Sequence, residues 1–405
     1  MFPGLAITVA NAPAHPITQR YDLPVSPFIT GCITAALVLL VALAWPGVRR
    51  GPRAGAPPMV ESWRDELPAL AVISRLLTVL LLGVAITAGR LGADDDLENL
   101  APALVVGVAW PVLVLASILL GPVWRWADPW DSTARVLTRG QPGDGTGSVR
   151  PAAVLALPWL WYLSAYQYPL APRSVGLMLA VYSLLTVAGC LAVGRVRWLS
   201  TCEPLGIGLA WMARLPRGRL ADWDPPRGAT ALLGVLAGGT LFAAVRRSEI
   251  WAAPNSAQQA TLLATLGLLA SCAVATCAIW WMAAAAGRRS VRAAAARAVV
   301  PAVAGIIVAV AMDRNRLTTS LQLLPGLLGD PFGLGWDLLG EPGAGLNPAP
   351  LGITGLIATQ VAVVTAGHLA GAIGLSRSVR PVERAPVALG LSLLCGASVV
   401  ALASH

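Results

Sequence analysis

The sequence contains no lysine, and charged residues of either sign make up only 12% of it. Soluble globular proteins carry roughly a quarter charged residues. Together with 56% hydrophobic residues and a mean hydropathy of +0.69, this excludes an ordinary soluble domain. Cysteine is also scarce: the six cysteines include no CxxC pair, so we expect no structural disulfides.

Long apolar stretches predict an all-α polytopic membrane protein. A membrane-spanning helix needs about 20 mostly apolar residues. The stretches that fit number about ten, at residues 27–47, 67–89, 101–121, 152–171, 174–194, 228–245, 259–286, 298–324, 350–372 and 386–403. No intervening segment is long enough to bury its own core, so residues 1–405 form a single integral-membrane domain. No internal repeat is visible.

The distribution of arginine predicts the orientation of these helices. All 29 basic residues are arginine, and most lie in alternate loops, which include 122–150 and 195–227. Cytoplasmic loops retain an excess of cations. We therefore expect these loops to be cytoplasmic, and both termini, including the tail 1–26, to lie outside the cell membrane. The net charge of +9 then fits anionic lipid of the bilayer as a partner, not nucleic acid.

Each of the two long cytoplasmic loops contains an acidic residue followed by proline. In "WRWADPWDS", Asp128-Pro129 is typical of a helix start, and Trp130 is expected to anchor at the headgroups. The alternative is a partner or ligand site that uses Arg125, Asp128 and Asp131. In "CEPLGIGLAWMARL", we expect a helix lying on the membrane, with Glu203 capping or pairing locally.

The stretch "LLGDPFGLGWDLLG" (327–340) is apolar, but its proline and glycines forbid a continuous helix. We expect residues 325–349 to form an ordered external cap, either interfacial or re-entrant. Asp330 is expected to cap a short helix, and Asp337 to point into the mouth of the bundle or into water. Trp336 is expected to anchor at the headgroups and, with Phe332, Leu334, Leu338 and Leu339, to supply the apolar surface whose burial orders the cap.

The charges before this cap leave two alternatives. Asp313 and Arg316 fall within the predicted span 298–324, where charges are costly in lipid. Either the helix ends near Met312 and the charges lie in external water, or they face a cavity as an i, i+3 pair.

Histidine offers weak metal candidates only. His15 and Asp22 precede the first span, where they join an acidic external surface that also includes 94–98. His368 lies within a span and has no other histidine or acidic residue near it in sequence. An external divalent cation or a basic partner is the functional interpretation, and a solvated loop is the alternative.

Four blocks of the chain resemble one bacterial membrane family. They are "AHPITQRYDLPVSPF" (14–28), "ENLAPALVVGVAWPVLVLASILLGPVWRWADPW" (98–130), "AVYSLLTVAGCLAVGRVRWLSTCEPLGIGLAWMARL" (180–215) and "QLLPGLLGDPFGLGWDLLG" (322–340). In this order they resemble the multi-span, largely actinobacterial proteins called fenitrothion hydrolase-like. The resemblance covers most of the chain. It implies hydrolysis of a phosphotriester by a metal-activated water.

The chain differs from that family at the residues that the hydrolase activity in the family's name would require. The family's HxxHY-type run corresponds to 309–313, which reads "AVAMD" here, and its NPW is Asp128-Pro129-Trp130. Both histidines are replaced, so the resemblance does not carry hydrolase activity over to this chain.

Three function classes follow. A membrane subunit or scaffold that docks partner proteins through ordered loops fits the sequence best, because no catalytic residue or cofactor motif is visible. A phosphotriester hydrolase rests on the resemblance. A permease needs polar groups at membrane depth, for which Arg75, Gln167, Gln322, Gln360 and His368 are few.

Overall fold

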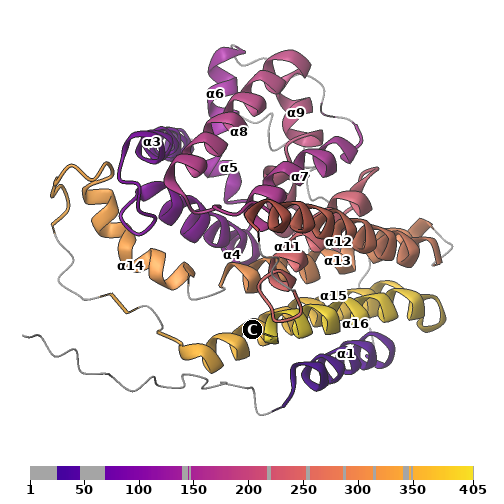
Figure 1. Ribbon diagram of the computed structural model, residues 1–405. Coiled ribbons are helices and arrows are strands. Elements are labelled where there is room, and N and C mark those ends of the chain that lie inside the picture. The colour runs from indigo at the N-terminus through magenta and orange to yellow at the C-terminus, as the bar shows by residue number, and fades with distance from the viewer. Residues whose placement is uncertain are drawn as a thin grey trace, which may run out of the picture.

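A computed structural model describes residues 25–45, 69–138, 145, 147–216, 220–251, 256–285, 289–312, 316–340, 346–347 and 350–404. Every regular element in these ranges is a helix (Figure 1). The helices are α1 (Pro27–Ala44), α3 (Ala69–Leu91), η1 (Pro102–Ala109, a π-helix), α4 (Trp110–Leu120), α5 (Trp124–Ala127), α6 (Pro129–Leu137), α7 (Arg150–Ser164), α8 (Pro172–Val193), α9 (Arg195–Thr201), α10 (Pro204–Met212), α11 (Ala229–Val245), α12 (Ala257–Ala285), α13 (Arg289–Ala311), α14 (Arg316–Gly329), α15 (Gly352–Ser378) and α16 (Pro381–Ala403).

The predicted all-helical character is confirmed, and eight helices in the described ranges are long and apolar enough to cross a membrane, as a multi-span protein requires. They are α1, α3, η1 with α4, α8, α12, α13, α15 and α16. The predicted count of about ten is not reached. The stretches 152–171 and 228–245 contain α7 and α11, which have only 15 and 17 residues.

The predicted span 298–324 is wrong in its extent. Helix α13 begins at Arg289 and ends at Ala311, and a separate helix, α14, begins at Arg316. The start of α13 tolerates arginine because the long side chain can reach a polar partner. The Nε of Arg297 donates to the Trp223 carbonyl at 2.6 Å.

The centre of the bundle is made by α11 and α13, whose side chains are buried on nearly every face. Glycines let their neighbours approach closely. A Cβ at Gly371 of α15 would overlap the Ala298 carbonyl of α13, and a Cβ at Gly238 of α11 would lie 2.6 Å from the Cα of Cys272 of α12. These contacts place α12 and α15 against the central helices.

Helix α1 packs beside α16 and α15, although α16 is the last helix of the chain (Figure 1). A Cβ at Gly31 would lie 2.9 Å from the Gly396 carbonyl, so the two backbones cross closely. At one end of the pair the Arg384 guanidinium donates to the Ala42 carbonyl at 3.0 Å.

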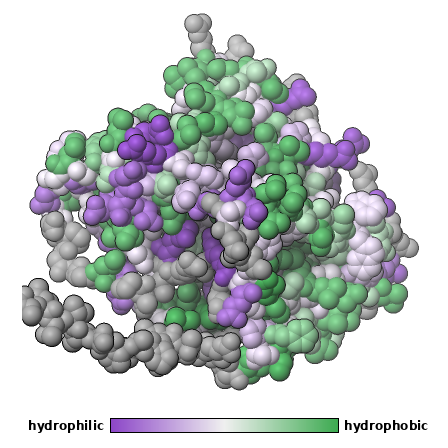
Figure 2. All heavy atoms as spheres, in the orientation of Figure 1, coloured by the Kyte–Doolittle hydropathy of each residue, from purple (hydrophilic) through white to green (hydrophobic). Residues whose placement is uncertain are grey.

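The outward faces of the long helices carry large apolar side chains. Leu80 on α3, Leu184 on α8 and Val274 on α12 are at least 64% exposed. Figure 2 shows hydrophobic side chains over much of the visible face. In a chain with this many long apolar helices, such exposure is typical of contact with lipid.

Two stretches of the chain, with α7 between them, fold to the same plan. In each, a membrane helix ends at a glycine with positive φ, Gly121 (102°) after α4 and Gly194 (98°) after α8. A short helix follows, and then a buried acid caps a nine-residue helix that begins with proline: Asp128 caps α6 and Glu203 caps α10. We call these stretches, 110–137 and 172–212, the tandem units. The sequence showed no repeat here, because the units share a plan and few residues.

Candidate functional site

The described residues include a buried cluster of charges around Asp131, which lies in the first turn of α6. Its carboxylate pairs with the guanidinium groups of Arg75 on α3, Arg195 on α9 and Arg135 one turn further along α6. Arg75 and Arg195 are 5% and 1% exposed. Burying a charge is costly unless it is paired, and here one carboxylate is shared by three cations. The nearby arginines hold the pKa of the Asp131 carboxyl below its usual value, although burial opposes this.

Arg75 links this cluster to the first tandem unit. Its Nε donates to the Arg125 carbonyl at 2.7 Å, and the neighbouring Ser74 hydroxyl donates to the Trp126 carbonyl at 2.6 Å. Side chains of α3 thus satisfy carbonyls of the short helix α5 and its flank. A cation inside a membrane helix is therefore explained by its partners on α5 and α6.

Asp128 is the N-cap of α6 and is almost completely buried. Its Oδ1 accepts from the backbone N–H groups of Trp130 and Asp131 at 3.0 and 2.9 Å. Burial, together with the Asp131 and Glu203 carboxylates, raises its pKa to about 8; the Asp131 N–H and Arg75 only partly offset these effects. Asp128 is thus protonated in a large fraction of molecules at neutral pH.

Glu203 plays the same capping role in the second tandem unit. Its two carboxylate oxygens accept from the Leu205 and Gly206 N–H groups at 2.9 and 2.5 Å. The Tyr182 hydroxyl of α8 donates to the same carboxylate. Burial raises the pKa of Glu203, while these three hydrogen bonds lower it.

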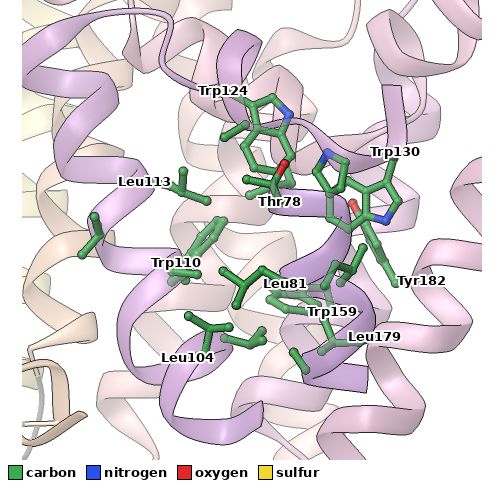
Figure 3. A pocket seen from close by; sticks show the side chains of 18 of the residues that line it. Thr78, Leu81, Leu104, Trp110, Leu113, Trp124, Trp130, Trp159, Leu179 and Tyr182 are labelled. Atoms are coloured by element: carbon green, nitrogen blue, oxygen red, sulfur yellow. The ribbon is translucent and has the colours of Figure 1, made fainter. Parts of the chain in front are cut away.

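Beside these acids lies an apolar cavity of about 280 Å³ (Figure 3). The start of each capped helix forms part of its wall, through Pro129 and Trp130 of α6 and Pro204 and Leu205 of α10. Other wall residues come from α3, η1, α4, α5, α7, α8 and α11, and include Thr78, Leu81, Ala85, Leu104, Trp110, Leu113, Trp124, Ala156, Trp159, Leu179, Tyr182 and Leu236. The π-helical turn of η1 borders this cavity, and such turns occur frequently at functional sites.

A second, polar chamber of about 40 Å³ lies on the other side of Trp124. Trp124 is 8% exposed and borders both cavities. Its indole nitrogen is buried without a hydrogen-bond partner within the described residues. A Cβ at Gly206, which also lines the polar chamber, would lie 3.0 Å from this nitrogen. Figure 3 shows the nitrogen directed away from the aliphatic wall of the apolar cavity.

Two further cavities lie toward the opposite ends of the same helices. An open polar cavity of about 760 Å³ is bordered by the acids 94–96 and by Arg246, Arg247 and Arg316. A small cavity of about 60 Å³ shares Arg247 and Arg316 with it and shares Trp110 with the apolar cavity. The four cavities therefore form a series through the bundle, with Trp110 and Trp124 as shared walls.

The structure brings four sequence-predicted residues into this site, of which Asp131 is the centre of the charge cluster. Asp128 and Arg125 line the polar chamber and Trp130 lines the apolar cavity. The predicted start of α6 at Pro129 is confirmed. Trp130 is not a headgroup anchor, because it is 6% exposed and its indole N–H donates to the Ser183 hydroxyl at 3.0 Å.

Helix α10 also differs from its prediction as a helix on the membrane surface. Its side chains are buried, and Trp211 is only 1% exposed. The helix is apolar because it packs against α4, α7 and α13 inside the protein. The local capping role expected for Glu203 is confirmed.

The predicted external cap contributes nothing to this site. Asp330 does not cap a helix: its carboxylate accepts from the Leu334 and Gly335 N–H groups, at 2.9 and 2.6 Å, in a turn after α14. Desolvation raises its pKa, but the backbone hydrogen bonds together outweigh this effect and lower the pKa below its usual value. Trp336 is 46% exposed and rests edge-on against Phe332, so the burial expected of this stretch is not found. Asp337 is exposed.

The remaining predicted residues divide into two groups. His15, Asp22 and Asp313 lie outside the described residues. Arg316 borders the polar cavity, and His368 is fully buried in α15 with its Nδ1 2.8 Å from the Val364 carbonyl. Within the described ranges, no group of three His, Cys, Asp or Glu side chains is placed to hold a metal ion.

Sequence reasoning missed the pairing of Arg75 and Arg195 with Asp131, and it missed Tyr182. A charge within a predicted span was the available signal for Arg75. Its partner lies 56 residues away in sequence, so only the fold identifies it. No protein-family model, curated protein or solved structure matches this chain.

Proposed function

We propose that this multi-span membrane protein is a carrier that takes a small apolar or amphipathic molecule into the cavity between α3, η1, α4 and α8. The supporting observation is the position of this cavity, which lies between two polar cavities at opposite ends of the same helices. Its volume of about 280 Å³ is near the lower end of the range for small-molecule sites.

The wall of the cavity favours an apolar substrate portion. Aliphatic and aromatic side chains make up nearly all of it, and the Tyr182 hydroxyl is directed to Glu203. Ligand sites combine such walls with a few placed polar groups. Here the polar groups gather at one end, around Asp128 and Asp131, where the two tandem units meet.

The series of cavities supports movement of the substrate. Trp110 separates the apolar cavity from the small cavity beside Arg247, and Trp124 separates it from the polar chamber. Rotation of a single indole would join neighbouring cavities. A carrier that alternates access needs such a barrier on each side of its central site.

The experiment measures quenching of tryptophan fluorescence by 1-bromodecane in the purified full-length protein. Thr78 lines the cavity, whereas Thr87 is exposed on the same helix, and each hydroxyl bonds to a carbonyl of the preceding turn. We expect Thr78→Phe to reduce saturable quenching strongly and Thr87→Phe to leave it near the wild-type level. Equal quenching in both variants, or no saturable quenching in the wild type, would overturn the proposal.

The scaffold role remains a second candidate. It is favoured by exposed apolar side chains after α14, where Leu334, Leu338 and Leu339 are 64–66% exposed. A partner subunit seated there would protect residues 330–340 from proteolysis in the native membrane but not after purification. Neither the cavities nor the charge cluster adds support for the phosphotriester hydrolase that the resemblance implies.

A further inference from the structure

We propose that the polar chamber beside Trp124 holds the carboxylate head of an amphipathic acid whose hydrocarbon tail lies in the apolar cavity. This inference rests on the proposed function, because it names the class of molecule that the carrier takes. It follows from the hydrogen-bonding character, charge and size of the chamber.

Arg75, Arg125 and Trp124 line the chamber together with Asp128 and Asp131. The Trp124 indole N–H is buried and has no partner within the described residues. A buried donor without a partner is costly, so a ligand acceptor placed there would gain the full interaction. The Asp131 oxygens already accept from three arginines.

The charge balance around the chamber also favours an anion. Arg75, Arg135 and Arg195 all pair with Asp131, so three guanidinium groups gather around one carboxylate. Arg125 borders the same chamber. In a site shielded from water, an excess of positive charge attracts a negatively charged group more strongly than it would at an exposed surface.

The protonation state of Asp128 determines whether the site remains favourable for an anion. Burial raises its pKa to about 8, so it is largely neutral near neutral pH and can itself donate a proton to an acceptor. At higher pH it becomes a second carboxylate that would repel the head of the ligand. The titratable and charged groups that face it are Arg75 of α3, Asp131 of α6, Tyr182 of α8 and Glu203 at the start of α10.

The volumes of the two cavities set the size of the molecule. The polar chamber, at about 40 Å³, has room for roughly two to four water-sized groups, since one water needs roughly 10–15 Å³. A carboxylate fits this space, whereas a substituted phosphate with its further oxygens does not. Because Trp124 is the wall that separates the two cavities, its indole must rotate before one molecule can occupy both, and the bound molecule would then lie against the indole ring.

The test uses the full-length protein in detergent with two probes, 10-bromodecanoic acid and 10-bromodecan-1-ol. Their tails are alike, and both quench tryptophans of the apolar cavity if they bind there. We expect the acid to bind the wild type about tenfold or more tightly than the alcohol near neutral pH, because hydrogen bonds to a charged group are the stronger ones. Well above the pKa of Asp128, this preference should fall.

Two variants separate the roles of the chamber residues, and each is judged by the concentration at half-maximal quenching. Trp124→Phe keeps an aromatic wall and removes the N–H, so it should weaken binding of the acid more than binding of the alcohol. Asp128→Asn keeps a helix cap and cannot ionise. It should abolish the loss of acid binding at high pH, and the ionisation of the ligand itself is common to both proteins.

The possible outcomes distinguish this inference from the proposed function. Equal binding of acid and alcohol at every pH, with Trp124→Phe indistinguishable from wild type, would overturn the carboxylate site while leaving the carrier cavity intact. A pH dependence that is unchanged in Asp128→Asn would also overturn it. Failure of both probes to give saturable quenching would remove the carrier proposal as well.

Discussion

Asp131 of α6 and Arg195, the first residue of α9, form a buried ion pair that joins the two tandem units. The residues are 64 positions apart in sequence. In each unit a positive-φ glycine ends the membrane helix, and a capped short helix follows. The ion pair between Asp131 and Arg195 holds the short helices of the two units together beside the cavity. Figure 1 shows α6 and α9 in the same part of the molecule. The position of the polar chamber depends on that contact.

Asp131→Asn should therefore destabilise the protein strongly. The substitution leaves the buried Arg75 and Arg195 without their charged partner, and breaking a buried pair in this way costs about 3–5 kcal/mol. The matched control is Asp94→Asn, because Asp94 pairs with Arg173 at the surface, where both side chains are more than 60% exposed. Exposed pairs contribute about 0–1 kcal/mol. Thermal unfolding in detergent compares the two, and equal Tm values would show that the cluster does not stabilise the fold.

The stability of the wild type should fall as the pH rises from about 4 to about 8. The pKa of Asp128 is raised to about 8 in the folded protein from a usual value of 3.8, so the folded state binds the proton more tightly. Its contribution is present at low pH and is lost as the pH rises through the folded pKa. Asp128→Asn removes this titration. The free energy of unfolding of the variant should therefore increase relative to that of the wild type over the same range. A constant difference in Tm between the two proteins across this range would contradict a raised pKa of Asp128 in the folded protein.

Substitution of alanine for glycine on α15 should weaken the contact between α13 and α15 at one position and leave it intact at another. A Cβ at Gly371 would overlap the Ala298 carbonyl, whereas a Cβ at Gly374 meets no atom within 4 Å. Gly371→Ala should cost about 1–3 kcal/mol through backbone displacement, while Gly374→Ala should be neutral or stabilise the helix slightly. Both are measured by thermal unfolding. The reverse order of Tm values would show that α13 and α15 do not pack at Gly371.

The small cavity beside Trp110 should admit reagents from the side of residues 94–96 only. Thr240 lines this cavity, which shares Arg247 and Arg316 with the open polar cavity. In a background without native cysteines, Thr240→Cys should react with a small impermeant thiol reagent from that side. Adding Trp110→Ala should extend reactivity to a cysteine placed at Ala156 in the apolar cavity. Reactivity of the Thr240 cysteine from both sides would contradict a closed wall at Trp124.

The local features of the site were predictable from the sequence. Asp128 and Glu203 each precede proline at the start of a nine-residue helix, and that spacing predicts an N-cap wherever the helix lies. The apolar stretches predicted a multi-span helical protein. This prediction, like that of the N-caps, depends only on residues that are close together in the sequence.

The features that failed depend on what lies across the fold. Trp130 and Trp211 were assigned to the membrane surface because tryptophan is common there, but packing of the tandem units buries both. Trp336 was expected to be buried and is half exposed, because the loop after α14 turns outward on hydrogen bonds to Asp330. An apolar side chain is expected to be removed from water. Its chemistry alone does not show whether it then contacts lipid or the rest of the protein.

The pairing of α1 with α16 has a consequence for how the chain is made. Proteins are synthesised from the N-terminus, and the hydrogen bond from Arg384 to the Ala42 carbonyl joins residues 342 positions apart. Helix α1 therefore lacks this neighbour until α16 has been synthesised. Its glycine face around Gly31 can close on Gly396 only at that point, so the contact between α1 and α16 forms later than contacts among the helices that lie between them in sequence.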